Sequence, residues 1–260
     1  MEVIIQPDAA AVSKEAARLF ERQLAAKPGS VLGLATGSTP LGLYQELIAL
    51  HADRRIDFAR AVSFNLDEYV GLPRDHPLSY GAYMREQLFE RINLPLASTH
   101  VPDGMARDIP AHCAEYEDAI RRAGGIDLQL LGIGSDGHIG FNEPSSSLSS
   151  RTRLKTLTPR TIADNARFFG SEAEVPRHVI TMGVGTIMEA RQIVVLATGG
   201  KKSAAVQAMV EGPITADVPA SILQMHPRCV LIVDELAAAQ LRRADYYRWV
   251  FAHKPAWQRV

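Results

Sequence analysis

Two carboxylates and an imidazole stand within eight positions in the segment 132–144. Asp136, His138 and Glu143 belong to the sequence Gly-Ile-Gly-Ser-Asp-Gly-His-Ile-Gly-Phe-Asn-Glu-Pro. A histidine exchanges protons near neutral pH, and a neighbouring carboxylate fixes its tautomer and stabilises its charged form. The segment therefore predicts acid–base chemistry, and the alternative is a histidine that is only hydrogen-bonded within a loop.

Two other interpretations of this segment are disfavoured. Its glycines have the spacing of a dinucleotide-binding motif, but that motif needs an acidic residue about 20 positions further on, where this chain has Leu157. A zinc ion on Asp136 and His138 would normally have a cluster of further His or Cys ligands, which the sequence lacks. We therefore expect neither a cofactor nor a metal.

A second acidic site follows the apolar run 61–64. Asp67 and Glu68 stand shortly after this run, so Asp67 at the carboxyl end of a strand could act as a base. Adjacent Asp and Glu residues also commonly mark a turn or the start of a helix. The pair alone does not separate these interpretations.

Two loops have residues suited to binding a phosphate. The first joins the apolar run 31–35 to a helical pattern, and its small residues and the helix amino end favour an anion, although they also fit a capped helix start with Thr39 as N-cap. The second, 198–203, resembles a nucleotide P-loop but has Val195 where that motif needs glycine, which leaves a cationic loop suited to one sugar phosphate or a solvated lysine pair. The candidate anion-binding residues of the first loop are Thr36, Gly37, Ser38 and Thr39.

Apolar runs that alternate with helical patterns must position these residues. This order predicts an α/β fold with a doubly wound, mostly parallel sheet, helices on both faces and a single domain over residues 1–260. The expected strands cover 31–35, 61–64, 126–133, 179–182, 192–197 and 229–233, and the expected helices cover 11–26, 40–51, 80–91, 111–122, 159–169, 202–210 and 236–251.

Composition excludes several classes of protein. The net charge is −1, with 28 basic and 29 acidic side chains and no long run of like charge, so a nucleic-acid partner is not expected. No apolar run approaches the ~18 residues of a membrane span, and the amino terminus lacks a secretory leader, so we expect a cytoplasmic protein without membrane contact. Cys113 and Cys229 are far apart in the sequence and are expected to be buried and reduced.

Taken together, the motifs resemble those of the glucosamine-6-phosphate deaminase (glucosamine/galactosamine-6-phosphate isomerase) family. The resemblance runs from about residue 31 to 235. It rests on Ala-Thr-Gly-Ser-Thr-Pro, Phe-Asn-Leu-Asp-Glu-Tyr-Val-Gly-Leu, Asp-Gly-His-Ile-Gly-Phe-Asn-Glu-Pro, Ser-Arg-Thr-Arg, Asn-Ala-Arg-Phe-Phe and Met-Gly-Val-Gly-Thr-Ile.

The resemblance implies conversion of glucosamine 6-phosphate and water into fructose 6-phosphate and ammonia, without a redox cofactor or metal. It implies that Asp67 moves the C2 proton of the open-chain sugar to C1. His138 would open the sugar ring, with Asp136 and Glu143 setting its charge and orientation. The enolamine charge needs hydrogen-bond donors, for which the backbone at 134–137 is a candidate.

For the substrate phosphate, the resemblance points to the loop 36–39, Arg167 and Lys202. An arginine fork and a point-charge lysine suit one dianionic group. Arg167 falls on the helical pattern that begins at Pro159, which belongs to a mobile lid in the family, here around residues 158–177. Closure of the lid over the sugar would exclude water from the enolamine.

Some bacterial relatives are hexamers activated by N-acetylglucosamine 6-phosphate at a subunit interface. The resemblance therefore predicts a homo-oligomer and an activator site, although Arg248 lies near a position that carries tyrosine in activated relatives, which counts against activation. The matching positions are Ser146, Arg153, Lys155 and Thr156, and their alternative role is a solvated basic strand face.

Two alternative functions are weighed against the deaminase. A 6-phosphogluconolactonase shares the phosphate loop and a similar Gly-x-Gly-x-Asp-Gly-His signature, but its continuation runs into a serine and a Phe-Pro pair, where this chain has Phe141, Asn142 and Glu143. A non-catalytic sugar-phosphate sensor would carry a helix-turn-helix and could dispense with the catalytic carboxylates. Both comparisons favour the enzyme.

Overall fold

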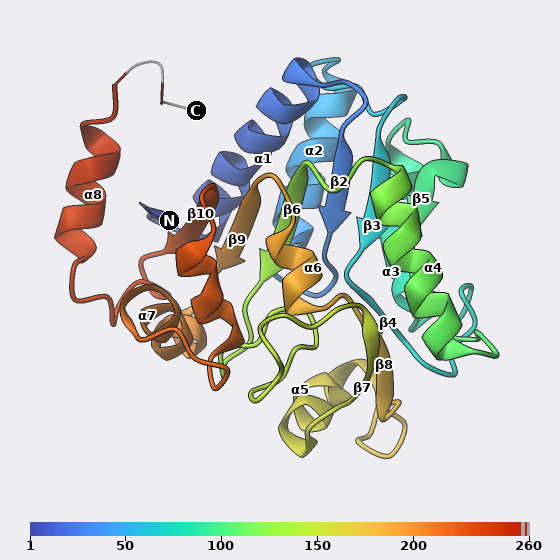
Figure 1. Ribbon diagram of the computed structural model, residues 1–260. Coiled ribbons are helices and arrows are strands. Elements are labelled where there is room, and N and C mark those ends of the chain that lie inside the picture. The colour runs from blue at the N-terminus through green and yellow to red at the C-terminus, as the bar shows by residue number, and fades with distance from the viewer. Residues whose placement is uncertain (256–257, 259–260) are drawn as a thin grey trace.

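A seven-stranded parallel sheet forms the centre of the computed structural model, which describes residues 1–255 and 258 (Figure 1). Every pairing between neighbouring strands of this sheet is parallel. In spatial order the strands are β1 (Glu2–Gln6), β10 (Cys229–Asp234), β9 (Ile193–Ala197), β6 (Leu128–Gly132), β2 (Val31–Leu34), β3 (Val62–Asn65) and β5 (Thr99–His100).

Helices flank the sheet on both faces (Figure 1), which confirms the predicted doubly wound α/β fold. Because both faces are covered, every residue of β2, β9 and β10 is buried. The helices are α1 (Ala9–Ala26), α2 (Leu41–Ala52), α3 (Tyr80–Gln87), α4 (Ile109–Arg122), α5 (Pro159–Phe169), α6 (Val184–Met188), α7 (Ser203–Glu211) and α8 (Ala244–Ala252), with 3-10 turns at Phe89–Arg91, Leu96–Ser98, Gly200–Lys202 and Pro219–Met225.

The direction in which strands are added to the sheet reverses between β2 and β6. From β2 the chain adds β3 and β5 on one side, whereas from β6 it adds β9 and then β10 on the other side. In open parallel sheets a crevice forms at the carboxyl ends of the strands where the order reverses. The loops that follow β2 and β6 therefore open into one crevice.

A small antiparallel sheet lies beside the carboxyl ends of the main sheet. It consists of β4 (Asp67–Tyr69), β8 (His178–Thr181) and β7 (Arg153–Thr156), and α5 connects β7 to β8. The run 179–182 was expected among the strands of the main sheet, so this expectation was wrong. Instead, β8 pairs with β4, which follows the main-sheet strand β3 after Leu66. The Met182 amide donates to the Leu66 carbonyl at 2.7 Å, at the point where the chain passes from one sheet to the other.

Three expected helices begin later than the sequence suggested, α7 by only one residue. The pattern over 236–251 forms a helix only from Ala244, because the Asp234 carboxylate accepts the Ala237 amide at 2.7 Å and so stabilises a turn. Helix α2 begins at Leu41, with Pro40 rather than Thr39 as its N-cap.

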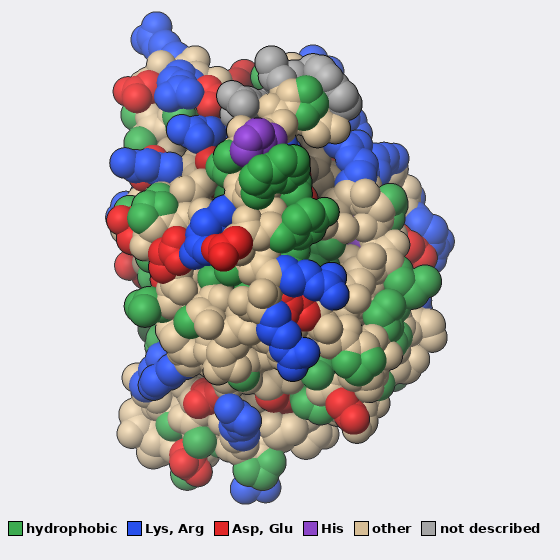
Figure 2. All heavy atoms as spheres, turned by 90° about the vertical axis from the view of Figure 1, so that its left-hand side faces the viewer, with side chains coloured by type: hydrophobic (Ala, Val, Ile, Leu, Met, Phe, Trp, Pro, Cys, Tyr) green, Lys and Arg blue, Asp and Glu red, His purple; other side chains and the backbone are tan. Residues whose placement is uncertain are grey.

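The outer surface around α8 carries exposed aromatic side chains. Tyr246 is 60% exposed and Trp249 is 58% exposed, and hydrophobic side chains gather among charged ones on this side of the molecule (Figure 2). Cys113 and Cys229 are both buried. None of the helices in the described part of the chain is long and apolar enough to cross a membrane.

Candidate active site

A cavity of about 570 Å³ opens at the carboxyl ends of the central strands. The loops after β2, β6 and β9 line it, together with the start of β4 and one face of α5. With Tyr80 at the start of α3 included, the structure thus brings together residues from six separate segments of the sequence. Among the residues singled out from the sequence, Thr36, Gly37, Ser38, Thr39, Asp67, His138, Arg167 and Lys202 line this cavity.

Asp67 is the most strongly perturbed carboxyl group of the cavity. It lies at the first position of β4 and is only 5% exposed. Burial, and then the negative charge of Glu68, raise the pKa of Asp67 to about 8. A side chain on Gly140 would approach the Asp67 Oδ2 to 3.5 Å, so glycine there keeps the space beside this carboxylate open. A carboxylate of raised pKa is a stronger base than an exposed one.

Asp136 and His138 form a hydrogen-bonded pair in the loop that follows β6. The Asp136 Oδ1 lies 2.7 Å from the His138 Nδ1 and also accepts the His138 backbone amide at 3.2 Å. Burial opposes ionisation of Asp136, but these hydrogen bonds and the imidazole charge outweigh it and hold its pKa well below the usual range. A side chain on Gly134 would overlap the imidazole, because its Cβ would lie 2.3 Å from the ring. The loop therefore packs around one orientation of His138.

Glu143 approaches the same imidazole from the other end of the loop. Its side chain is 3% exposed, and its Oε2 lies 3.7 Å from the His138 Nδ1. The other oxygen, Oε1, accepts the hydroxyls of Thr161 at 2.5 Å and Thr158 at 3.2 Å, in the first turn of α5. Glu143 therefore connects the histidine to the helix that carries Arg167.

The loop after β2 is held by two phenols, the buried Tyr44 and the half-buried Tyr83. The Tyr44 hydroxyl donates to the Ala35 carbonyl at 2.5 Å, and the Tyr83 hydroxyl donates to the Gly37 carbonyl at 2.6 Å. Gly37 has a φ of 102°, a conformation that glycine adopts without strain. These contacts leave the amides of the loop at the amino end of α2, where helix geometry favours an anion.

Two cations line the same cavity as this loop. Lys202 is half-buried, and burial lowers its pKa despite the opposing charges of the Asp164 and Asp136 carboxylates. Arg167 is exposed and lies over the Phe168 ring, with its guanidinium carbon 4.7 Å from the ring centre. The lining of the cavity thus combines two cations, the loop 36–39 and the acid–base group His138.

Several residues that contribute to the cavity carried no recognised signal in the sequence. Tyr80 lines it from the start of α3, and its hydroxyl lies 3.3 Å from that of Tyr69. Arg160 on α5 donates to the Ser135 hydroxyl at 2.9 Å, which connects α5 to the loop after β6. Their roles depend on tertiary contacts, so spacing along the chain could not reveal them. Only the Thr-x-x-Thr spacing of Thr158 and Thr161 gave a local signal, that of a helix N-cap.

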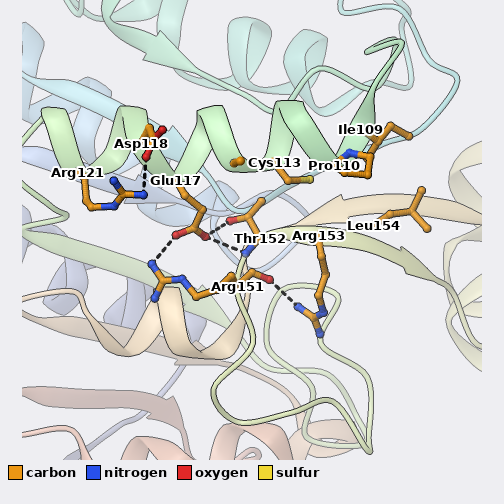
Figure 3. Close-up of a pocket in the computed structure, with 11 residues that line it drawn as sticks. Ile109, Pro110, Cys113, Glu117, Asp118, Arg121, Arg151, Thr152, Arg153 and Leu154 are labelled. Atoms are coloured by element: carbon orange, nitrogen blue, oxygen red, sulfur yellow. Dashed lines mark hydrogen bonds and ion pairs between the residues drawn. The ribbon is translucent and has the colours of Figure 1, made fainter.

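The four residues singled out for activator binding lie outside this cavity. Arg153 lines a second cavity of about 700 Å³ between α4 and β7 (Figure 3), and it donates to the Asn142 Oδ1 at 2.9 Å. Arg153 and Lys155 are half-buried while Thr156 is exposed, in agreement with a strand that turns alternate side chains to one face. Ser146 is buried three residues after Glu143, in the loop that leads toward β7.

Among the residues that the structure describes, Asp136, His138 and Glu143 also form a group whose potential metal-ligand atoms lie within 4.8 Å of one another. The imidazole Nδ1, however, already makes the hydrogen bond to Asp136. A metal at this position would have to replace the shared proton, so the arrangement fits proton transfer better than ligation.

Comparisons with known proteins lead to the same family as the motifs. Residues 7–231 match the family model described as glucosamine-6-phosphate isomerases/6-phosphogluconolactonase. A glucosamine-6-phosphate deaminase of Arthrobacter sp. strain FB24 is 55% identical over 99% of each chain. The deaminase of Cellvibrio japonicus is 57% identical over 96% of this chain and 95% of its own.

Solved structures give the same result. A monomeric glucosamine-6-phosphate deaminase has a TM-score of 0.90 and 42% identity, over 92% of this chain and 99% of its own. A 6-phosphogluconolactonase from Trypanosoma cruzi has a TM-score of 0.73 at 21% identity, over 93% of this chain and 97% of its own, which is a likeness of fold alone. The chain therefore belongs to the family of glucosamine-6-phosphate isomerases and 6-phosphogluconolactonases.

Proposed function

We propose that this chain is a glucosamine-6-phosphate deaminase, which converts glucosamine 6-phosphate and water into fructose 6-phosphate and ammonia. The observation that carries the proposal is a buried carboxylate, Asp67, that shares one cavity with the His138 imidazole, the loop 36–39 and the cations Lys202 and Arg167. Relatives more than 50% identical over nearly the whole chain are deaminases, whereas the solved lactonases share only about 20% of residues. Both findings favour deamination over lactone hydrolysis and over a sensor without catalysis.

The phosphate of the sugar binds between the loop 36–39 and the two cations. Backbone amides and hydroxyls of the loop donate to the phosphate oxygens, and Lys202 supplies a positive charge at short range. Arg167 lines the same cavity from α5, so that its guanidinium reaches the phosphate when α5 moves toward the loop. This helix and the segment after it, residues 158–177, act as the lid of the site.

His138 opens the sugar ring. Its Nδ1 proton is held by Asp136, which leaves Nε2 to exchange a proton with the ring oxygen and the C1 hydroxyl. When the imidazole gains a proton, the carboxylates of Asp136 and Glu143 stabilise the positive charge. The product of this step is the open chain, with an aldehyde at C1 and the amine at C2.

Asp67 then moves a proton from carbon to carbon. The carboxylate removes the hydrogen of C2, the C2 electron pair forms the C1–C2 double bond of an enolamine, and the C1 carbonyl oxygen takes up a proton to become a hydroxyl. The proton held by Asp67 is then added to C1, the nitrogen lone pair forms the C2=N double bond, and the nitrogen gives up a proton that replaces the one taken by the oxygen. The resulting imine at C2 adds water and releases ammonia, which leaves the ketone of fructose 6-phosphate. The ammonium group of the bound amino sugar lies next to the C2 hydrogen, so it favours ionised Asp67 and lowers its pKa from the value in the empty site.

The geometry of Glu143 supports a coupling between lid and catalysis. One oxygen binds the first turn of α5 and the other faces the imidazole, so a shift of α5 on substrate binding changes the distance between Glu143 and His138. Water is excluded from the enolamine by the same movement.

The chain works as one sugar-phosphate isomerase/deaminase domain over residues 1–260, in the cytoplasm. It associates into a homo-oligomer. Ser146, Arg153, Lys155 and Thr156 bind an anionic activator, N-acetylglucosamine 6-phosphate. The half-buried Arg153 guanidinium supports this, because the oxygens to which it donates are the uncharged ones of the Asn142 amide and the Arg151 carbonyl.

A direct assay tests the proposed activity. Purified protein is incubated with glucosamine 6-phosphate, and ammonia and fructose 6-phosphate are measured, then the assay is repeated with 6-phosphogluconolactone. We expect equimolar ammonia and fructose 6-phosphate, no lactone hydrolysis and no effect of a chelator. Lactone hydrolysis without ammonia release would overturn the proposal, and reversible loss of turnover on metal removal would overturn the metal-free mechanism.

A further inference from the structure

Glu68 is a buried carboxylate that the proposed mechanism does not use. It is 2% exposed and follows Asp67 directly in β4. Adjacent residues of a strand point to opposite faces, so Asp67 lines the cavity while Glu68 lies behind it. A charged group in that position needs partners, because burial of an unpaired carboxylate costs several kcal/mol or more.

The partners of Glu68 are two backbone amides at the start of α3 and one in its own strand. Its Oε1 accepts the Tyr69 amide at 2.8 Å and the Tyr80 amide at 3.0 Å, and its Oε2 accepts the Gly81 amide at 2.9 Å. The next amide of this turn, that of Ala82, is capped by the N-cap residue itself. Glu68 lies in β4, outside α3, and supplies the negative charge that the amino end of this helix favours.

Helix α3 touches the cavity at two points. Tyr80, in its first turn, lines the cavity and stacks on Phe141 with an angle of 7° between the ring planes. Tyr83, one turn further, donates its hydroxyl to the Gly37 carbonyl in the phosphate loop. A displacement of the first turn of α3 would therefore change the positions of both the cavity wall and the phosphate loop.

We propose that Glu68 is a positioning residue that ties the strand carrying Asp67 to the phosphate loop through the amino end of α3. The inference rests on the proposed function. Glu68 sets the distance between the general base Asp67 and the bound phosphate, so that C2 of the sugar lies next to Asp67. Glu68 itself touches neither the substrate nor the reacting atoms.

The charge of Glu68 gives this role a signature beyond stability. It is the second cause, after burial, of the raised pKa of Asp67, because like charges disfavour ionisation of each other. Removing that charge lowers the pKa of Asp67. The other titratable groups that act on or around these two carboxyls are the phenols of Tyr44, Tyr69, Tyr80 and Tyr116, the guanidinium of Arg74, and, across the cavity, His138, Asp164, Arg167, Lys201 and Lys202.

The test compares Glu68→Gln with Glu86→Gln, which removes the same charge from an exposed position of α3. For Glu68→Gln we expect the acid limb of the kcat/KM profile to move about half a unit or more to lower pH. We also expect the KM for glucosamine 6-phosphate to rise about tenfold. Glu86→Gln should change neither.

A second variant keeps the test decisive if Glu68→Gln folds poorly. Tyr83→Phe removes only the hydroxyl that donates to Gly37, so it should raise the KM about two- to tenfold without moving the acid limb. Amide exchange at Tyr80 and Gly81 provides a readout that needs no activity, and these amides should exchange faster in Glu68→Gln than in Glu86→Gln.

The outcomes separate this inference from the proposed function. If the parent protein releases no ammonia from glucosamine 6-phosphate, the proposed function fails, and inorganic phosphate affinity then tests the link between Glu68 and the loop. If the parent is active but Glu68→Gln changes stability alone, with the KM and the acid limb unchanged, Glu68 is only a helix cap. An unchanged KM in Tyr83→Phe would likewise overturn the link through α3.

Discussion

Replacement of Asp67 by asparagine should make the protein more stable while it abolishes activity. The folded-state pKa of Asp67, about 8, lies above its ordinary value of 3.8, so the native state binds this proton more tightly than the unfolded chain does. Between about pH 4 and pH 8 the native state therefore holds more protons, and stability decreases as pH rises. The amide introduced by Asp67→Asn cannot ionise, so the stability of the variant does not decrease with pH for this reason.

The size of the effect follows from the pKa shift. With about 1.4 kcal/mol per pKa unit, the limit at pH 7 is roughly 4 kcal/mol, and at pH 5 it is roughly 1.5 kcal/mol. Water in the open cavity beside Asp67 solvates the carboxylate and reduces both values, so we expect about 1–3 kcal/mol at pH 7. For a chain of this size that corresponds to a rise in Tm of about 3–10 °C.

Thermal and urea unfolding at pH 5, 6, 7 and 8 provide the assay. The stability difference between Asp67→Asn and the parent should grow steadily with pH. Asp53→Asn removes a charge from an exposed position at the end of α2 and serves as the control, with a small difference that does not follow pH in this way. A difference for Asp67→Asn that is constant between pH 5 and pH 8, or a less stable variant at pH 8, would refute the reasoning from burial.

Three other substitutions test separate parts of the site. Lys202→Met should raise the KM about 10- to 100-fold in steady-state assays, because a charge-assisted contact to phosphate is lost, with a smaller effect on kcat. Asp136→Asn should lower kcat/KM about 10²-fold or more across the pH profile, since His138 loses the partner that fixes its tautomer. Thr161→Val removes the shortest hydrogen bond to Glu143 and should lower kcat about tenfold in the same assay.

Opposite results would remove the corresponding role. A Lys202→Met enzyme with parental KM would place the phosphate elsewhere. Parental kcat/KM in Asp136→Asn would leave the ring-opening pair without support, and an unchanged kcat in Thr161→Val would disconnect α5 from Glu143.

The fold was predictable where strands are long and apolar. Runs such as 192–197 and 229–233 could be assigned because both faces of β9 and β10 are covered by helices, so that every side chain over 193–197 and 229–233 is apolar. The pairing of β4, β8 and β7 in the small sheet could not be predicted in this way. Strand β4 has only three residues, two of which are acidic, and its antiparallel partner β8 is held by contacts that no local pattern encodes.

The site was predictable where its residues are contiguous. The loop around Asp136 and His138 and the loop 36–39 each lie in one stretch of sequence after a strand, and the structure places both at the crevice. Glu68 shows the limit of this approach. The sequence suggested a helix start for the Asp-Glu pair, and Glu68 does bind the amino end of a helix, but that helix begins 12 residues later.

Asp67 is the residue on which the proposed chemistry depends most, as the base that removes the C2 hydrogen. The most direct test is the rate of ammonia release from glucosamine 6-phosphate at pH 8 by Asp67→Asn, with fructose 6-phosphate measured in parallel. We predict a loss of about 10²- to 10⁴-fold in kcat, with the KM little changed. Release of ammonia by Asp67→Asn at the parental rate would contradict this role.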